Sequence, residues 1–439
     1  MNEIPGAGIN TTHYWFLILP GIFIKRTLWY FVGIFQYGII TTRAYALFNI
    51  KIYQNYSALN KNNMLIFVFF FSIIFTAMKI GILGSRGIPN RYGGFEQFAE
   101  YLSLGLVKMG AEVWVYCSGS HPQRNEIWNG INLIYCTDPE DKLGTAGQFI
   151  YDLNCIRDSR KRDFDIIYQL GYTSNSVWYR LLPKKPVIVT NMDGLEWKRS
   201  KYKKPVQKFL KYAEKMAVKS SDLLVADSEG IQKYLGKEYG CKAHFLPYGA
   251  ENFQNPDKAS LRKLSLEPYN YCMLMARMQP DNHIEEIIRG VLSANSNLPL
   301  IIIGQTENKF GIYLKQEYES ENIRFIGGIF DQDQLNQLRY FSALYFHGHS
   351  AGGTNPSLLE AMASSALICA HDNQFNREVL LSNAFYFKNP NDISTLLKSQ
   401  IEIKTSRQTF INNNLLIIRK KYNWSKIIPE YYEIFKKLL

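Results

Sequence analysis

Two loops of the sequence combine glycines with the start of a helix, a pattern suited to binding an anion. The loop GSRGIPNRYGGFE at 84–96 follows the apolar segment KIGIL and ends at Gly93 and Gly94, where an amphipathic pattern begins. Glycine lets backbone amides approach a ligand closely, and the first amides of a helix lack partners. Gly93 and Gly94 are therefore expected to bind a phosphate, although the spacing is not the GxGxxG of a dinucleotide site. The alternative is a turn that only requires glycine.

The second loop lies in the stretch HGHSAGGTNPSLLEAMA at 347–363, directly after the apolar segment ALYF. Asn355 is a favoured helix N-cap and Pro356 a favoured first helical residue. Gly353 and Thr354 then lie just before a helix N-terminus, which makes a second anion-binding loop. Two such loops predict a ligand with two phosphates.

Glu360 follows in the same predicted helix, one to two turns from its start. A carboxylate there can accept hydrogen bonds from sugar hydroxyls beside a bound diphosphate. The alternative is a solvated helix residue, which the apolar neighbours in LLEAMA make less favourable.

Short apolar strands alternating with helical stretches must position these loops, because parallel strands joined by crossover helices carry their ligands at the strand carboxyl ends. From Met78 onward we expect an α/β protein with two Rossmann-like domains in tandem, whose parallel sheets face a central cleft. The expected strands are, in the first series, KIGILG, EVWVYC, INLIYC, DIIYQL, PVIVTN, DLLVAD and AHFLPYG, and in the second YCMLMAR, PLIIIG, NIRFIGG, ALYFHGH and ALICAHD.

Four segments follow from this pattern. Residues 1–77 form an apolar N-terminal extension, 78–250 and 251–420 are the two Rossmann-like domains, and 421–439 is a helix expected to pack back on the first domain. The extension is either a membrane-associating segment or an over-long gene product in which the working protein starts at Met78. Its last apolar run is shorter than the roughly 20 residues a spanning helix needs.

Composition narrows the class of partner without naming one. The 439 residues are 46% apolar and 20% charged, with a formal net charge of +12. Such a charge favours an anionic partner, namely nucleic acid, anionic lipid or a phosphate-bearing substrate, unless it only confers solubility. The six cysteines form no CxxC pair, so neither a zinc site nor a disulfide framework is indicated.

The motif GGTNPSLLEAM within this two-domain pattern resembles the GT-B glycosyltransferases, and among them the retaining glycosyltransferase family 4. Two further stretches, RGIPNRYGGFEQFAE and NMDGLEWKRSKY, resemble the bacterial rhamnosyltransferases of polysaccharide assembly. The resemblance covers about residues 78–437. It implies that Arg277, at the end of YCMLMAR, contacts the donor diphosphate and that Glu360 holds the nucleotide ribose.

The sequence departs from the family at two positions. The family usually has a glutamate where Gly352 stands, and a lysine where Asn282 or His283 stands. These departures leave open which group neutralises the leaving phosphate. His349 is a candidate donor-binding residue for this role, and a structural loop histidine is the alternative.

The resemblance also points to the acceptor side. Asp193 in DGLEWKR falls where many family members have a histidine near the reacting sugar, and a carboxylate there could orient or deprotonate the acceptor hydroxyl. The alternative is a loop aspartate that caps local backbone. Arg86, Glu196 and Trp197 are expected to line the acceptor pocket, with Trp197 offering a face for a sugar.

A basic run follows and reads as an amphipathic helix with a cationic face. Such helices lie on anionic membranes, and the alternative is a solvated face over a core-facing stripe. Its nine cations are Lys198, Arg199, Lys201, Lys203, Lys204, Lys208, Lys211, Lys215 and Lys219.

Together these features predict a retaining glycosyltransferase that moves rhamnose from dTDP-rhamnose onto a lipid-linked glycan, at the cytoplasmic face of the inner membrane. No metal, no cofactor beyond the nucleotide-sugar co-substrate and no nucleic-acid partner are expected. The alternatives are a hexosyltransferase using a UDP-sugar, a sugar-nucleotide epimerase of the same fold, and a non-catalytic membrane-associated binding protein.

Overall fold

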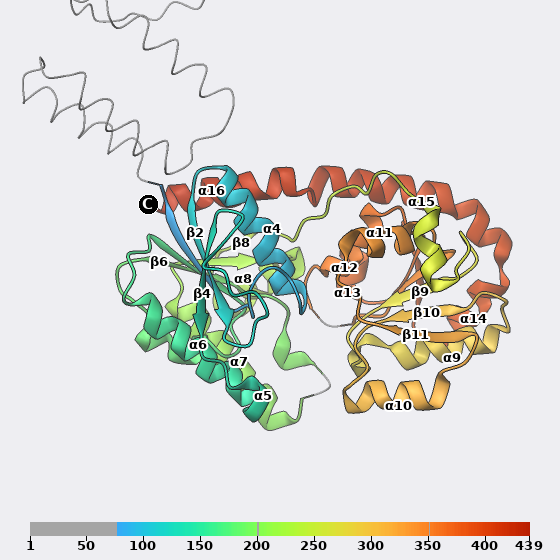
Figure 1. Cartoon of the computed structure of the whole chain (residues 1–439), viewed down its shortest axis with the longest axis horizontal. Coiled ribbons are helices and arrows are strands. Elements are labelled where there is room, and N and C mark those ends of the chain that lie inside the picture. Colours follow the sequence, from blue (N-terminus) through green and yellow to red (C-terminus); the bar gives the residue numbers. More distant parts are fainter. Residues whose placement is uncertain (1–76, 200–201, 351) are drawn as a thin grey trace, which may run out of the picture. The chain divides into compact units, whose positions relative to one another are not determined.

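The computed structural model describes residues 77–199, 202–350 and 352–439. The apolar extension expected at 1–77 therefore lies, apart from Ala77, outside the described residues. The described chain forms two α/β lobes, each built on a parallel sheet with helices on its faces (Figure 1). The expected pair of Rossmann-like domains is confirmed.

The N-terminal lobe contains an eight-stranded sheet in the order β3-β4-β2-β1-β5-β6-β7-β8, parallel except for the pair β3 and β4. Its strands are β1 (Lys79–Leu83), β2 (Glu112–Ser118), β3 (Ile127–Trp128), β4 (Ile131–Cys136), β5 (Ile166–Leu170), β6 (Val187–Asn191), β7 (Leu223–Ala226) and β8 (Ala243–Phe245). Its helices are α4 (Gly94–Lys108), α5 (Glu140–Leu143), α6 (Thr145–Ser159), η1 (Ser176–Leu181), η2 (Glu196–Lys198), α7 (Lys204–Ser220) and α8 (Glu229–Tyr239).

The C-terminal lobe contains a six-stranded parallel sheet in the order β11-β10-β9-β12-β13-β14. Its strands are β9 (Cys272–Met275), β10 (Leu300–Ile303), β11 (Ile323–Gly327), β12 (Leu344–His347), β13 (Ile368–His371) and β14 (Phe385–Phe387). The helices that follow the first lobe are η3 (Lys258–Leu264), η4 (Pro280–Asn282), α9 (Ile284–Ala294), α10 (Lys309–Tyr318), α11 (Gln332–Tyr340), α12 (Pro356–Ala363), α13 (Gln374–Leu380), α14 (Pro390–Lys398), α15 (Gln400–Lys421) and α16 (Trp424–Leu438).

The central strands are apolar on both faces because helices cover both sides of each sheet. All four residues of β10 are buried, as are the last four of β1. In α4, Phe98, Leu102 and Leu106 recur every four residues and are buried. This spacing places them on one face of the helix, which packs on the sheet.

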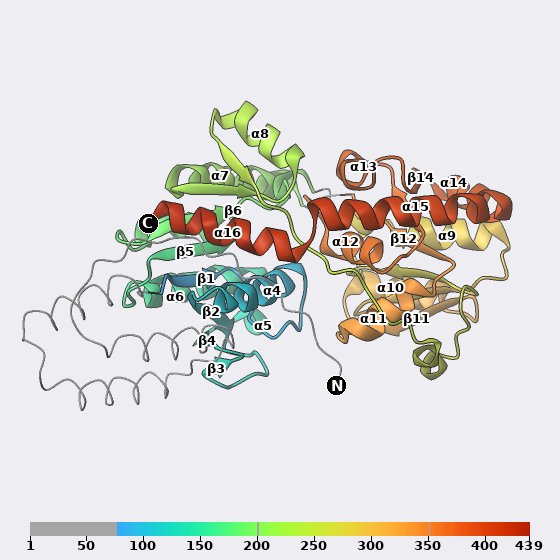
Figure 2. The same ribbon diagram turned by 90° about the horizontal axis from the view of Figure 1, so that it is seen from above.

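The last two helices connect the lobes. Helix α15 packs on the C-terminal lobe, and α16 returns to the N-terminal lobe, where it lies against α4 (Figures 1 and 2). Helix α16 also contacts the sheet, since the hydroxyls of Tyr431 in α16 and Tyr168 in β5 are 3.1 Å apart. Between the two helices, the amide of Ala250 donates to the carbonyl of Tyr422 at 2.7 Å, so the linker and the returning chain run side by side.

No helix within the described ranges combines the length and the apolar character that crossing a membrane requires.

Candidate active site

The two lobes meet through glycines that allow their backbones to touch. A Cβ atom on Gly194, after β6, would lie 2.5 Å from the Cα of Gly352, in the loop after β12. A Cβ atom on Gly94 would lie 3.3 Å from the ring of Pro356. The starts of α4 and α12, which carry the two predicted anion-binding loops, are therefore neighbours across the lobe interface.

The first loop is held in place by carboxylates of its own lobe. Gly93 is the N-cap of α4 and supplies no side-chain cap, while Glu96 in the first turn accepts a hydrogen bond from the Arg86 amide at 2.8 Å. The Arg86 guanidinium forms two bonds to Glu140, of 2.8 and 2.6 Å, and lies over the ring of Tyr92. Arg86, predicted to bind the acceptor, thus anchors this loop in the structure.

The second loop starts α12 as the sequence indicates. The Asn355 side chain accepts a bond from the Ser357 amide at 3.0 Å, and Pro356 is the first helical residue. The Thr354 amide, however, donates to the Asp227 carboxylate at 3.1 Å. A Cβ atom on Gly353 would lie 1.9 Å from an oxygen of the same carboxylate. An acidic side chain of the N-terminal lobe therefore lies against this loop.

Asp227 and Asp193 are two carboxyl groups in this interface. Burial raises the pKa of Asp227 well above its usual 3.8, and the charge of Asp193 raises it further. Burial also raises the pKa of Asp193, while the positive charge of Arg199 opposes that rise. Asp193 is thus a carboxyl group that can hold a proton more readily than an ordinary aspartate, as a group exchanging a proton with a hydroxyl requires.

Glu360 lies 8% exposed at the same interface. Its carboxylate accepts hydrogen bonds from Arg339, a fully buried residue of α11, and from Gln97 of α4 in the other lobe. Glu360 is therefore not a solvated helix residue. Its charge is compensated by a buried guanidinium, and its second oxygen faces the N-terminal lobe.

A pocket of about 410 Å³ opens beside this contact, between the two lobes. The N-terminal lobe contributes Arg91, Gln97 and Tyr101, and the C-terminal lobe contributes Phe330 and Gln332. Aromatic rings and amides are groups that can stack on and hydrogen-bond a flat polar ring.

Arg277 follows β9 and is exposed, and its side chain has no ion pair or hydrogen bond to the described residues. Asn282 donates from its side chain to the Arg277 carbonyl at 2.7 Å, so it shapes the loop that presents Arg277. The His283 ring stacks on His371, with ring centroids 3.9 Å apart, and its Nδ1 lies 3.4 Å from Glu286. Neither residue adds a free cation at this point.

His349 lies in the loop between β12 and α12. Its carbonyl accepts bonds from the side chains of Asn373 and Asn376, at 3.1 and 3.0 Å. Burial lowers the pKa of His349 to about 3, and the charges of Arg277 and Arg199 act in the same direction. The imidazole is therefore neutral at neutral pH and adds no positive charge, and its buried Nδ1 has no hydrogen-bond partner among the described residues.

Arg199 crosses from the N-terminal lobe to the C-terminal lobe. Its Nε lies 2.7 Å from a Glu196 oxygen, and its Nη1 donates to Asp281 of η4 at 3.2 Å. The Asp281 carbonyl in turn accepts bonds from the amide and hydroxyl of Ser350. Glu196, predicted to line the acceptor pocket, thus helps to position a guanidinium at the interface.

Trp197 is held by groups of its own lobe. Its indole nitrogen donates to the buried Glu214 at 3.0 Å. The ammonium groups of Lys211 and Lys198 lie 4.7 and 5.3 Å from the centre of its ring. Lys211 also bonds Glu214, at 3.0 Å, so this lysine belongs to a packed network and not to an open cationic face.

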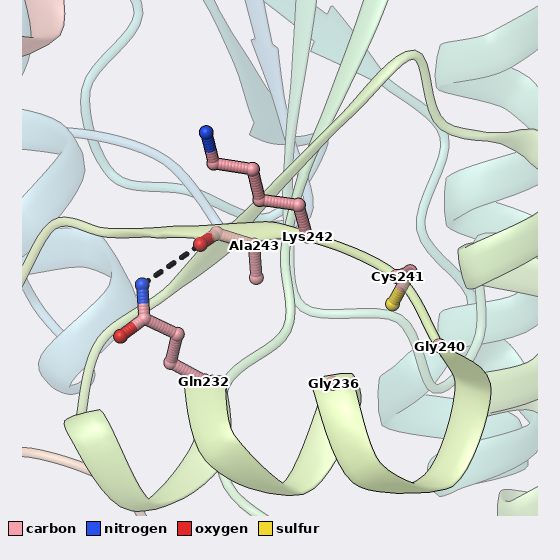
Figure 3. A pocket seen from close by; sticks show the side chains of 6 residues that line it. All are labelled: Gln232, Gly236, Gly240, Cys241, Lys242 and Ala243. Carbon is pink, nitrogen blue, oxygen red and sulfur yellow. Dashed lines mark hydrogen bonds between the residues drawn. The ribbon is translucent and has the colours of Figure 1, made fainter.

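Figure 3 shows a second pocket, of about 370 Å³, between α8 and β8 at the edge of the N-terminal lobe. The Gln232 side chain donates to the Ala243 carbonyl on its wall at 2.9 Å. Lys242 is the only charged residue that lines it. None of the predicted site residues lies there.

In the described residues, no cluster of three or more histidine, cysteine or acidic side chains is arranged to hold a metal ion.

The structure thus brings most of the predicted donor-binding residues to one interface and adds groups that the sequence analysis missed. Asp227 is the last residue of the segment DLLVAD. Its position at the end of a predicted strand is the sequence feature that could have placed it in the site. Arg199 was counted only as one cation of the basic run. Arg339 and Gln97 gave no local signal, because their roles depend on contacts with Glu360.

Comparison with known families supports the same division of the chain. Residues 258–415 match the family described as "Glycosyl transferases group 1". Residues 77–251 match a family described as "Domain of unknown function (DUF1972)". The two matches correspond to the C-terminal and N-terminal lobes.

Individual proteins resemble the chain over both lobes. An uncharacterized glycosyltransferase of Methanocaldococcus jannaschii is 24% identical over 301 residues, which cover 64% of this chain and 76% of that protein. A sucrose-phosphate synthase from Thermosynechococcus elongatus has a similar structure, with a TM-score of 0.71, 14% identity, and coverage of 82% of this chain and 99% of that chain. The Anabaena protein HepE in complex with UDP-glucose gives a TM-score of 0.64, 15% identity, and coverage of 82% and 100%.

Proposed function

We propose that the chain is a GT-B glycosyltransferase that transfers a sugar from a nucleoside diphosphate to a lipid-linked glycan, because its C-terminal lobe matches the family of glycosyl transferases group 1. The proposed donor is dTDP-rhamnose, and the proposed stereochemical outcome is retention. The match of the C-terminal lobe to the glycosyl transferases group 1 favours an enzyme over a purely non-catalytic binding role.

The observation that carries this proposal is the meeting of two glycine loops at two helix starts. Gly94 at the start of α4 and Pro356 at the start of α12 belong to different lobes and lie in contact. The dipoles at helix starts favour anions. Arg277, whose side chain forms no ion pair or hydrogen bond with the described residues, supplies a positive charge that acts on Asp193 and His349 at the same interface.

The reaction that we propose breaks the bond between the sugar C1 and the phosphate oxygen and forms a bond from C1 to the acceptor hydroxyl. Arg277 stabilises the charge that develops on the leaving diphosphate. The acceptor proton passes to the leaving phosphate on the same face of the sugar, with Asp193 orienting the hydroxyl. No metal ion or further cofactor takes part in this scheme.

A UDP-hexose is the second candidate donor. The Anabaena neighbour HepE was crystallised with UDP-glucose, which favours this donor class. The proposal of dTDP-rhamnose depends on the stretches RGIPNRYGGFEQFAE and NMDGLEWKRSKY, which resemble the rhamnosyltransferases.

A lipid-linked acceptor is supported by the surface of α7, which we propose lies on the cytoplasmic face of the inner membrane. This surface carries Lys204, Lys208 and Lys215, all exposed. Between them Phe209 and Tyr212 expose 39% and 54% of their surface. Exposed aromatic side chains among lysines suit the boundary between anionic headgroups and acyl chains.

The experiment that tests the donor is a panel of dTDP-rhamnose, UDP-glucose and UDP-galactose incubated with the full chain and membrane lipid extract. Release of nucleoside diphosphate that depends on the extract is expected from dTDP-rhamnose. Release from a UDP-hexose alone would replace the proposed donor by the second candidate, and release from none would contradict both.

A further inference from the structure

We propose that Arg199 binds the donor diphosphate together with Arg277, so that the N-terminal lobe supplies one of the two guanidinium groups that hold the leaving group. This inference rests on the proposed function and adds a charged side chain to a lobe that would otherwise contact the donor diphosphate only through the glycine loop at Gly93 and Gly94. Three observations carry it.

The first observation is the position of Arg199. Its side chain is 11% exposed, and Asp281, its partner in the C-terminal lobe, is 3% exposed. Asp281 lies in η4, which directly follows the loop that presents Arg277. Arg199 therefore reaches the loop of the C-terminal lobe that carries the other guanidinium.

The second observation is the charge balance around that loop. A nucleoside diphosphate brings at least two negative charges, and each must be compensated in a partly buried site. Asn282 is uncharged, and His349 is neutral because its pKa is low. Among the described residues here, Arg277 is the cation without a carboxylate partner.

The guanidinium of Arg199 lies close enough to Arg277 to act on the same neighbours. Both charges influence Asp193 and both influence His349. A diphosphate placed between the two guanidinium groups would lie beside Asp193, the residue that we place at the acceptor hydroxyl.

The third observation is that some N–H groups of the Arg199 guanidinium form no hydrogen bond with the described residues. A guanidinium carries five N–H groups in a planar fork that fits phosphate oxygens. The ion pair with Glu196 at 2.7 Å leaves the buried Nε without a well-directed hydrogen bond. The bond from Nη1 to Asp281 has an ordinary length of 3.2 Å. Binding of a diphosphate would then exchange one anionic partner of Arg199, Asp281, for another.

The test measures binding by calorimetry to the full chain and uses UDP, dTDP, inorganic pyrophosphate and the monophosphates UMP and dTMP as probes. The variants are Arg199→Met, Arg199→Lys and Arg277→Met. Lys198→Met is the matched control, because Lys198 is exposed, adjacent in sequence and equal in charge.

Arg199→Met is expected to weaken diphosphate binding about tenfold or more, since a hydrogen bond to a charged group is lost. Monophosphate binding should change less, Arg199→Lys should recover part of the loss, and Lys198→Met should bind like the unmodified chain. Equal affinities of Arg199→Met and the unmodified chain for diphosphates, with Arg277→Met weakened, would overturn the inference and leave the proposed function standing. Absence of diphosphate binding to the unmodified chain would overturn both.

Asp281→Asn provides a test that does not depend on removing the guanidinium. If Asp281 and the diphosphate compete for Arg199, this variant should bind diphosphates severalfold more tightly, and the gain should vanish when Arg199→Met is added. An equal gain in both backgrounds would show that Arg199 does not contact the diphosphate and would overturn the inference.

Discussion

The carboxylate of Asp227, at the end of β7, accepts a hydrogen bond from the backbone amide of Thr354 at 3.1 Å. The Thr354 hydroxyl donates to the Asp227 carbonyl as well. These bonds join the N-terminal lobe to the loop before α12.

This contact predicts a specific coupling between Asp227 and Gly353. A Cβ atom on Gly353 would lie 1.9 Å from the Asp227 carboxylate, so Gly353→Ala should lower the thermal unfolding temperature. In a chain that already carries Asp227→Ala the space is open, and Gly353→Ala should then cost much less. A double-mutant cycle of melting temperatures checks this.

Gly236→Ala serves as the control for that cycle, because the added Cβ would meet only an ordinary contact at 3.8 Å. Gly236 lies inside α8, so alanine should stabilise the helix by up to about 1 kcal/mol. An equal loss from Gly353→Ala in both backgrounds would contradict the contact.

Glu360→Gln is expected to reduce both stability and donor affinity. The substitution leaves the fully buried Arg339 without its carboxylate, a loss on the order of 3–5 kcal/mol. The buried ion pair is the reason to expect a loss of stability as well as a loss of donor affinity. Thermal unfolding of Glu360→Gln beside Glu402→Gln, an exposed residue of α15, measures the difference.

Donor binding is then measured by calorimetry with dTDP and UDP below the unfolding transition of the variant. Loss of a charge-assisted hydrogen bond to sugar hydroxyls should weaken binding roughly tenfold or more. Unchanged affinity would remove Glu360 from the donor site.

The raised pKa of the buried Asp152 carboxyl leads us to predict that the stability of the protein depends on pH. Burial raises the pKa of this carboxyl to about 7 from its ordinary 3.8, and the hydrogen bond from Ser174 only partly opposes the rise. A raised pKa in the folded state means that the contribution of Asp152 is complete below about pH 4 and is lost as the pH rises through about 7. The difference corresponds to a free energy on the order of 4 kcal/mol.

The stability of Asp152→Asn relative to that of the unmodified chain should therefore increase as the pH rises from 5 to 8. The relative stability of Asp163→Asn, at an exposed position, should not. Melting temperatures of the three proteins at both pH values decide the point, and parallel curves for all three would contradict the buried, protonated state of Asp152.

The α7 surface predicts salt-sensitive binding to anionic membranes. Reversing Lys204, Lys208 and Lys215 to glutamate should lower the fraction of the full chain that co-sediments with anionic vesicles. Lys211 is left unchanged because its bonds to Glu214 support the fold. High salt should imitate the reversal, since exposed charges are screened over about 8 Å at physiological ionic strength.

The control makes the same change of charge on the C-terminal lobe, at the exposed residues Lys258, Lys263 and Lys309. This variant should bind vesicles like the unmodified chain. Equal sedimentation of the two reversed proteins would show that α7 is an ordinary solvated surface.

The fold was largely predictable because its signals are local. Buried strands such as PLIIIG are apolar on both faces, and the Asn355-Pro356 start of α12 follows from capping chemistry alone. The edge strands β3 and β14 were missed because two or three residues carry no period. Strand order also has no local signal, since it depends on how crossovers are placed.

The candidate site was predictable only in its loops. Local glycine and helix-cap patterns predict the roles of Gly93 and Asn355. The partners of Glu360, in contrast, lie 21 and 263 residues away in the sequence. The prediction that Lys211 belongs to the cationic face is wrong for a related reason. Glu214 sits within the apolar stripe of α7, and a buried carboxylate there requires a cation that then no longer faces the solvent.

The mass of the product formed from dTDP-rhamnose and a membrane lipid extract tests the central claim most directly. With the full chain, a lipid-linked glycan in the extract should gain the mass of one deoxyhexose residue while dTDP is released in equal amount. Arg277→Met should slow this gain at least about tenfold, because it removes charge stabilisation of the leaving group. Consumption of the nucleotide sugar without any gain of mass in the lipid fraction would contradict the account.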